Sequence, residues 1–70
     1  MNRQTVSSSN ICSIGYDAKL QTLEIEFQDG GIYQYFSIPE SIYNALMSAS
    51  SCGSYFHRYI KDQYQWTKIQ

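Results

Sequence analysis

A hairpin pattern at residues 22–35, TLEIEFQDGGIYQY, is the strongest fold signal in this chain. Before the turn, apolar residues occupy every second position: Leu23, Ile25 and Phe27. This alternation predicts a strand with one face on a core and the other face, which carries Glu24 and Glu26, in water. Asp29-Gly30-Gly31 predicts a tight turn, and residues 32–37 predict the returning strand. The stretch is therefore expected to form an antiparallel hairpin.

The register of this hairpin determines where Tyr33 and Tyr35 point. A two-residue turn would pair Tyr33 with an acidic residue and place both tyrosines on the solvent face. A three-residue loop with Gly30 in a bulge would pair Ile25 with Tyr33 and turn both tyrosines to the core face. The polar Gln34 between them favours the second register, with the phenol oxygens reaching the rim of the core.

The N-terminal part of the chain predicts a lead-in and one further strand. Residues 1–5 are polar and show no alternation, so a flexible lead-in is expected there, followed by a single domain over residues 6–70. From Asn10 the pattern has period two. The residues expected on the inner face of this strand are Cys12, Ile14 and Tyr16.

Two amphipathic helices and a last strand are predicted after the hairpin. Ser37 and Glu40 have capping-box spacing and precede an apolar stripe at helical spacing. A second helix is predicted from Cys52 to Ile60, and residues 64–69 alternate again as a strand. The predicted fold is α+β, an antiparallel sheet of three to four strands with two helices on one face, in the order β-β-β-α-α-β.

Composition limits the possible functions. With 43% hydrophobic and 16% charged residues, the chain is expected to fold, and its 70 residues suffice for one domain. A net charge of −1 argues against tight non-specific binding to nucleic acid. Residues 51–70 are nevertheless mildly basic, with Arg58, Lys61 and Lys68 against Asp62. No targeting or membrane-spanning segment is recognised, so a cytoplasmic location without membrane contact is expected.

No motif typical of an enzyme or a metal site is present. Cys12, Cys52 and His57 provide too few ligands for a structural zinc site, and both thiols are expected in the core rather than in a disulfide. On one helix Cys52 and His57 would lie about 140° apart, which does not predict a catalytic dyad. Phosphate-binding loops and nucleophile elbows do not occur. A protein that is not an enzyme and has no metal or cofactor is expected.

Aromatic and basic residues remain as the candidate binding site. Tyr33 and Tyr35 could stack on nucleic-acid bases while Arg58 and Lys61 contact phosphates, with His57 at the margin. The competing interpretation is that a small core uses its tyrosines for packing, with the hydroxyl at the edge.

Short motifs along the chain resemble the KTSC domain. They are Ser8–Ile11, Ser13–Asp17, Leu23–Phe27, Tyr33–Tyr35, Ile38–Pro39, Tyr43, Gly53–Phe56 and Ile60. That family is named for its occurrence at the C-terminus of some lysyl-tRNA synthetases and also occurs as small free-standing bacterial proteins. The resemblance implies one small module whose function is not established, and the fusion to a synthetase suggests RNA as a ligand. Weak RNA binding is the first hypothesis, and protein–protein interaction or self-association is the alternative.

Overall fold

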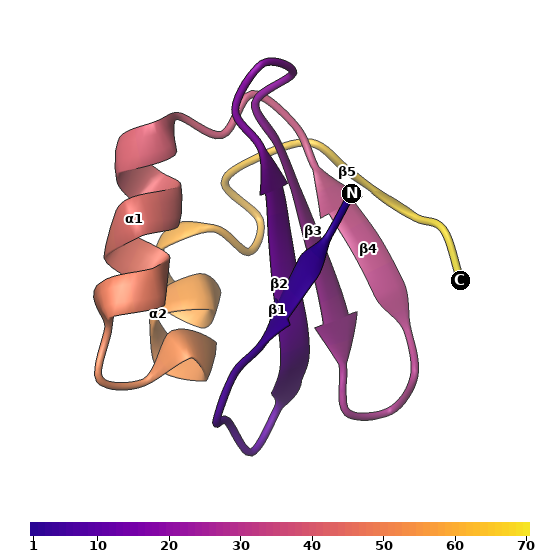
Figure 1. Ribbon diagram of the computed structural model, residues 1–70, viewed down its shortest axis with the longest axis vertical. Helices are drawn as coiled ribbons and strands as arrows, with labels where there is room; N and C mark the ends of the chain where they lie inside the picture. Colours follow the sequence, from indigo (N-terminus) through magenta and orange to yellow (C-terminus); the bar gives the residue numbers. More distant parts are fainter.

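A five-stranded sheet with two helices on one side makes up the protein (Figure 1), and the computed structural model describes all 70 residues. The elements are β1 (Arg3–Thr5), β2 (Ile11–Asp17), β3 (Thr22–Phe27), β4 (Ile32–Tyr35), α1 (Glu40–Ser48), α2 (Cys52–Tyr59) and β5 (Trp66–Lys68). Neighbouring strands are antiparallel, and their order in the sheet is β1-β2-β3-β4-β5. The predicted α+β class is confirmed. The predicted strand count is too low, and the order is β-β-β-β-α-α-β.

Strand β1 is the element that the sequence prediction lacks. Arg3–Thr5 lies where only a lead-in is predicted, and it pairs with β2 so that Arg3 is opposite Gly15. All three residues are exposed, so no hydrophobic alternation marks the strand in the sequence. It is held instead by the Arg3 side chain, which donates hydrogen bonds to the Ser13 hydroxyl and the Glu24 carboxylate.

The outer face of the sheet, which points away from the helices, carries a polar network around Glu24. This residue is only 7% exposed, because Arg3 from β1 and Gln34 from β4 both contact its carboxylate. Ser13 donates to Glu26, which lies 3.8 Å from the Arg3 guanidinium. The prediction of a solvated face is therefore wrong for Glu24. Desolvation raises the pKa of Glu24, but the hydrogen bonds from Gln34 and Arg3 outweigh it, so this pKa lies below its ordinary value.

The β3–β4 hairpin adopts the register with a three-residue loop. Ile25 pairs with Tyr33, and the Gly30 N–H donates to the Phe27 carbonyl oxygen at 2.9 Å. Gly30 has a φ of 95°, which a residue without a side chain adopts at little cost. The favoured register is confirmed, and it turns Tyr33 and Tyr35 toward the helix-covered face.

Strand β2 contains a bulge that changes the predicted face pattern. The register against β3 shifts between Ile11 and Ser13, so Ile11 and Ile14 are both fully buried although three positions separate them. Cys12 is consequently half-buried rather than in the core, where the sequence pattern predicts it. Cys52 is buried as predicted, and both thiols are free.

The two helices begin differently. Ser37 has a φ of 59°, which is not the extended backbone of an N-cap, and Pro39 occupies that position in α1 without a side-chain hydrogen bond. The predicted capping box is therefore wrong. Helix α2 is capped by Ser51, whose hydroxyl oxygen accepts from the Ser54 N–H at 3.2 Å. Neither helix is long and apolar enough to cross a membrane.

One hydrophobic core fills the space between the helices and the sheet. Its fully buried side chains come from β2, β3, the segment before α1, and both helical regions: Ile11, Ile14, Leu23, Ile25, Ile38, Leu46 and Ile60. Tyr16 joins this core from its edge, stacks on Tyr43 with ring centroids 4.6 Å apart, and donates a hydrogen bond to the Ile38 carbonyl oxygen.

Candidate functional site

Five aromatic rings join strands β3, β4 and β5 to helix α2. We call them the aromatic cluster: Phe27, Tyr33, Tyr35, Phe56 and Trp66. Their neighbouring ring centroids lie 5.3–6.5 Å apart, with stacked, tilted and edge-on orientations. Such geometry is favoured by the ring quadrupoles and adds to the burial of apolar surface. The cluster therefore forms a continuous wall at this end of the core.

A hollow of about 310 Å³ opens over the aromatic cluster, and all five rings line it. We call it the aromatic hollow. Polar residues complete its lining: Asn10, Asp29, His57, Lys61 and Asp62. An aromatic wall with a few polar groups is the usual composition of a small-ligand site, and the volume is at the lower end of the range for such sites, about 300–1,000 Å³.

Four of the five residues proposed from the sequence meet in the aromatic hollow. They are Tyr33, Tyr35, His57 and Lys61. His57 on α2 and Lys61, which follows the C-cap of α2, are both exposed, as the helical periodicity predicts. Arg58 does not line the hollow, and its guanidinium lies 5.9 Å from the centre of the Tyr59 ring.

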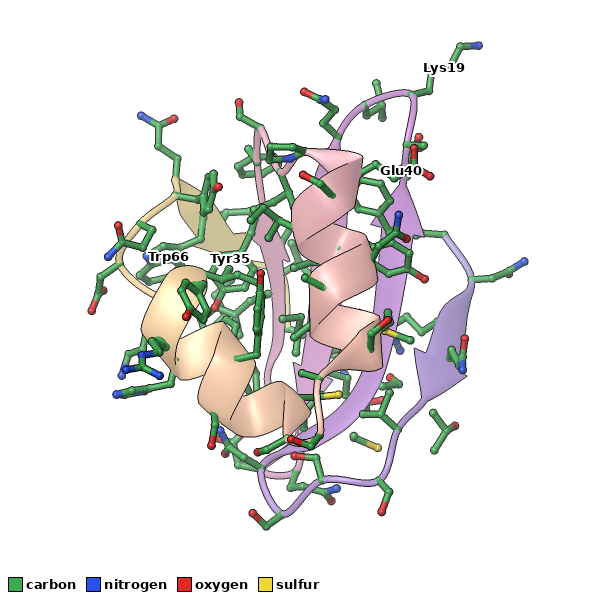
Figure 2. The ribbon with its side chains drawn as sticks, turned by 90° about the vertical axis from the view of Figure 1, so that its left-hand side faces the viewer. Lys19, Tyr35, Glu40 and Trp66 are labelled. Carbon is green, nitrogen blue, oxygen red and sulfur yellow. The ribbon has the colours of Figure 1, made fainter.

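The two tyrosines of β4 contribute different groups. Tyr35 is 5% exposed and packs edge-on against Phe56, so burial excludes the stacking role that the sequence analysis gives to its ring. Tyr33 is half-buried, and its ring centroid lies 5.4 Å from that of Trp66. Trp66 is 52% exposed, and Figure 2 shows it next to Tyr35 beside α2. The accessible stacking surface therefore consists of Tyr33 and Trp66, and sequence reasoning missed the second.

The Tyr35 hydroxyl is a titratable group without a hydrogen-bond partner in the protein. Burial raises the pKa of Tyr35 to about 12, and the charges of Tyr33 and Asp62 add to the shift. An unfolded tyrosine has a pKa near 10. Because the folded pKa is the higher one, the stability that Tyr35 contributes is complete below about pH 10 and is lost as the pH rises toward 12.

Alkaline titration of the folded protein should therefore show a late tyrosine. Phenolate absorbance should rise in more than one step across the seven tyrosines, with the Tyr35 step near pH 12. Tyr35→Phe should remove this step. Because phenylalanine cannot ionise, the variant should lose less stability than the wild type as the pH rises from about 10 to 12. An unchanged late step in Tyr35→Phe would contradict this assignment.

The charges of the aromatic hollow are not paired with one another. Every ion pair in the structure involves Arg3, on the outer face of the sheet. Asp29 accepts a hydrogen bond from the Gly31 N–H at 2.9 Å, so its carboxylate belongs to the turn. No side-chain hydrogen bond or ion pair holds Asp62 or Lys61. At the rim, the Lys68 ammonium lies 5.9 Å from the centre of the Tyr33 ring.

The cysteine thiols and the potential metal ligands are the other chemical groups of interest in the chain. The Cys52 thiol donates to the Leu46 carbonyl oxygen at 3.5 Å inside the core. No three His, Cys, Asp or Glu side chains come together as metal ligands. A second, wholly polar hollow of serine residues shares Asn10 and His57 with the aromatic hollow. The aromatic hollow is thus the place where the chain offers a ligand both shape and chemistry.

Comparison with known proteins gives consistent matches. A family model for the KTSC domain matches residues 7–64. An uncharacterized protein of Stutzerimonas stutzeri is 39% identical over 70 residues, covering 99% of both chains. A lysine–tRNA ligase of a Nostoc species is 41% identical over 54 residues, which are 77% of this chain and 10% of the ligase. The crystal structure of a KTSC domain protein from Yersinia pestis, 46% identical, superposes with a TM-score of 0.96 over 99% of this chain and 97% of that one.

Proposed function

Because this chain belongs to the KTSC domain family, which also supplies a segment of lysine–tRNA ligases, we propose that it is a non-catalytic module that binds single-stranded RNA. The observation that carries the proposal is the aromatic hollow, where stacking surface and free polar groups meet. Proteins recognise unstacked RNA bases by stacking them on aromatic rings and by hydrogen bonding to their edges. One base would enter the hollow and pack against Tyr33 and Trp66, whose ring planes are inclined by 57°, so that it stacks on one ring and meets the other at an angle.

Cations around the rim would contact the phosphates on either side of that base. Lys68 lies over the Tyr33 ring, and Arg58 is exposed on the same helix as His57, whereas Lys61 lines the hollow itself. So few cations neutralise only a few phosphates, and the net charge of the chain is −1. Binding is therefore expected to be weak and to fall as the salt concentration rises.

The relatives support RNA as the ligand by association. The ligase of the Nostoc species acts on tRNA, as its name states, and about one tenth of its length resembles this chain. The relatives suggest only the class of ligand. The contacts with that ligand are therefore argued from the residues of the hollow. A tRNA-related role also fits the cytoplasmic location predicted from the sequence.

Tyr33→Ala should weaken binding of a short single-stranded RNA about ten-fold, because stacking of one base contributes about 1–3 kcal/mol. Trp66 is the only tryptophan and lines the hollow, so its fluorescence reports the occupancy directly. Tyr59→Ala is the matched control, since Tyr59 is 48% exposed and lies outside the hollow. Unchanged Trp66 fluorescence on addition of RNA at low salt would contradict the proposal. Equal losses of RNA affinity in Tyr33→Ala and Tyr59→Ala would also contradict it.

A protein partner is the second candidate, favoured by the free edge of β5. This strand ends the sheet, and Trp66 and Ile69 are 52% and 49% exposed there. An open edge with apolar side chains can accept a strand from another chain. Sedimentation over a concentration series tests self-association. Capture from a lysate with and without nuclease separates the candidates, because only nuclease-resistant capture favours protein.

A further inference from the structure

The aromatic hollow is lined by one carboxylate and one ammonium that form no ion pair and come from neighbouring residues of the chain. They belong to Asp62 and Lys61, both of which line it. The other acid of the hollow, Asp29, is already bonded to the backbone of its own turn. Asp62 is therefore the carboxylate that is free to accept hydrogen bonds from a ligand.

The backbone at Asp62 does not require a carboxylate. Its φ is 64°, a left-handed conformation that glycine adopts without strain and that asparagine and aspartate tolerate better than other residues. A glycine or asparagine would serve the turn after α2 equally well. Asp62 and Tyr35 both line the hollow.

A phosphate group is a poor occupant for this hollow. Asp29 and Asp62 both line it, and they oppose the single lysine there. A phosphate would bring a further negative charge near these two carboxylates and would be repelled, whereas a neutral base would not. The phosphates belong at the rim, near Lys68, and the interior suits a base whose edge carries hydrogen-bond donors.

Guanine has the pairing edge that matches this pair of residues. Its N1–H and N2–H₂ groups are adjacent donors, which a carboxylate can accept together, and its O6 beside them accepts from an ammonium. On the same edge, adenine and cytosine each present one amino donor next to an unprotonated ring nitrogen, and uracil presents a single N–H between two carbonyl oxygens. These three bases would leave part of the Asp62 and Lys61 pair unmatched.

We propose that the aromatic hollow selects guanine: the base packs against Tyr33 and Trp66 while Asp62 accepts from its N1–H and N2–H₂ groups. Lys61 donates to O6. This inference rests on the proposed RNA binding and adds the identity of the base. It makes Asp62 a specificity-determining residue, a role outside the aromatic and basic set that RNA binding alone calls for.

The test compares the RNAs UUGUU, UUAUU and UUUUU on the full chain by Trp66 fluorescence. UUGUU should bind about ten-fold more tightly than the other two, the effect of one good bidentate contact. Asp62→Asn keeps a residue that tolerates the left-handed backbone, and it should bring UUGUU to within about two-fold of UUAUU. Asp17→Asn, with the same change of charge at the end of β2 and outside the hollow, should keep the full preference.

Lys61→Met provides a second variant that leaves Asp62 in place. It should lower the affinity for UUGUU more than that for UUAUU, because only guanine offers O6. Equal affinities of the wild type for the three RNAs, or an unchanged preference in Asp62→Asn, would overturn the guanine inference while RNA binding stands. Failure of all three RNAs to bind would overturn RNA binding itself and the inference with it.

Discussion

Leu46→Ala should lower the free energy of unfolding by about 2–5 kcal/mol, as expected when a fully buried leucine is truncated. Leu46 has no exposed surface and is the only residue of α1 that is buried. Its loss would leave a cavity at the point where α1 attaches to the core. For a domain of 70 residues, with a total stability of roughly 4–10 kcal/mol, this is a large fraction.

Leu20→Ala is the matched control, because Leu20 is 69% exposed in the loop between β2 and β3. Its cost should stay within about 0.5 kcal/mol. Urea unfolding followed by circular dichroism measures both variants. Equal losses of unfolding free energy in the two variants would mean that the burial of Leu46 does not stabilise the packing of α1 on the core.

Arg3→Met should destabilise the protein by about 1–3 kcal/mol at neutral pH, because it leaves the buried Glu24 carboxylate with Gln34 as its remaining side-chain partner. This loss of stability should exceed the loss caused by Arg58→Met, because the Arg58 guanidinium is exposed and forms no ion pair. Urea unfolding of the two variants gives the comparison. Equal stabilities would contradict the role of Arg3 in holding β1.

The effect of Arg3 should also depend on pH. The pKa of Glu24 lies below its ordinary value, so its contribution to stability is present above the pKa of an unfolded glutamate, about 4.3, and is lost as the pH falls through the folded value. The difference between wild type and Arg3→Met should therefore shrink on acidification. The double variant with Glu24→Gln should recover part of the loss at neutral pH, and a pH-independent difference would contradict the network.

The sequence predicts the parts of the fold that depend on neighbouring residues. The alternation of Leu23, Ile25 and Phe27 and the polar Gln34 are sufficient for the central hairpin and its register. Strand β1 could not be predicted, because the hydrogen-bond partners of Arg3 lie 10 and 21 residues away and no local sequence pattern indicates them. The bulge in β2 could not be predicted either, because only the pairing of β2 with β3 shows that Ile11 and Ile14 share a face.

For the candidate site, the sequence identified residue types better than their roles. His57 and Lys61 could be placed outside the apolar stripe of α2 from helical periodicity alone. The roles of Tyr35 and Trp66 depend on how β5 packs beside β4, which brings residues 35 and 66 into register. Asp62 enters the sequence analysis only as one charge in a basic segment, because its place in the hollow requires the turn after α2.

The sheet order has a consequence for how the molecule assembles. Strands β1 to β4 pair with their neighbours in sequence through short loops, whereas residues 36–65, which include both helices, separate β4 from β5. Contacts close in sequence cost less chain entropy and form faster than those that close a long loop. We expect the first four strands to form early and the docking of β5 to come last. Since Trp66 belongs to that strand, the aromatic hollow comes into existence in the final step of folding.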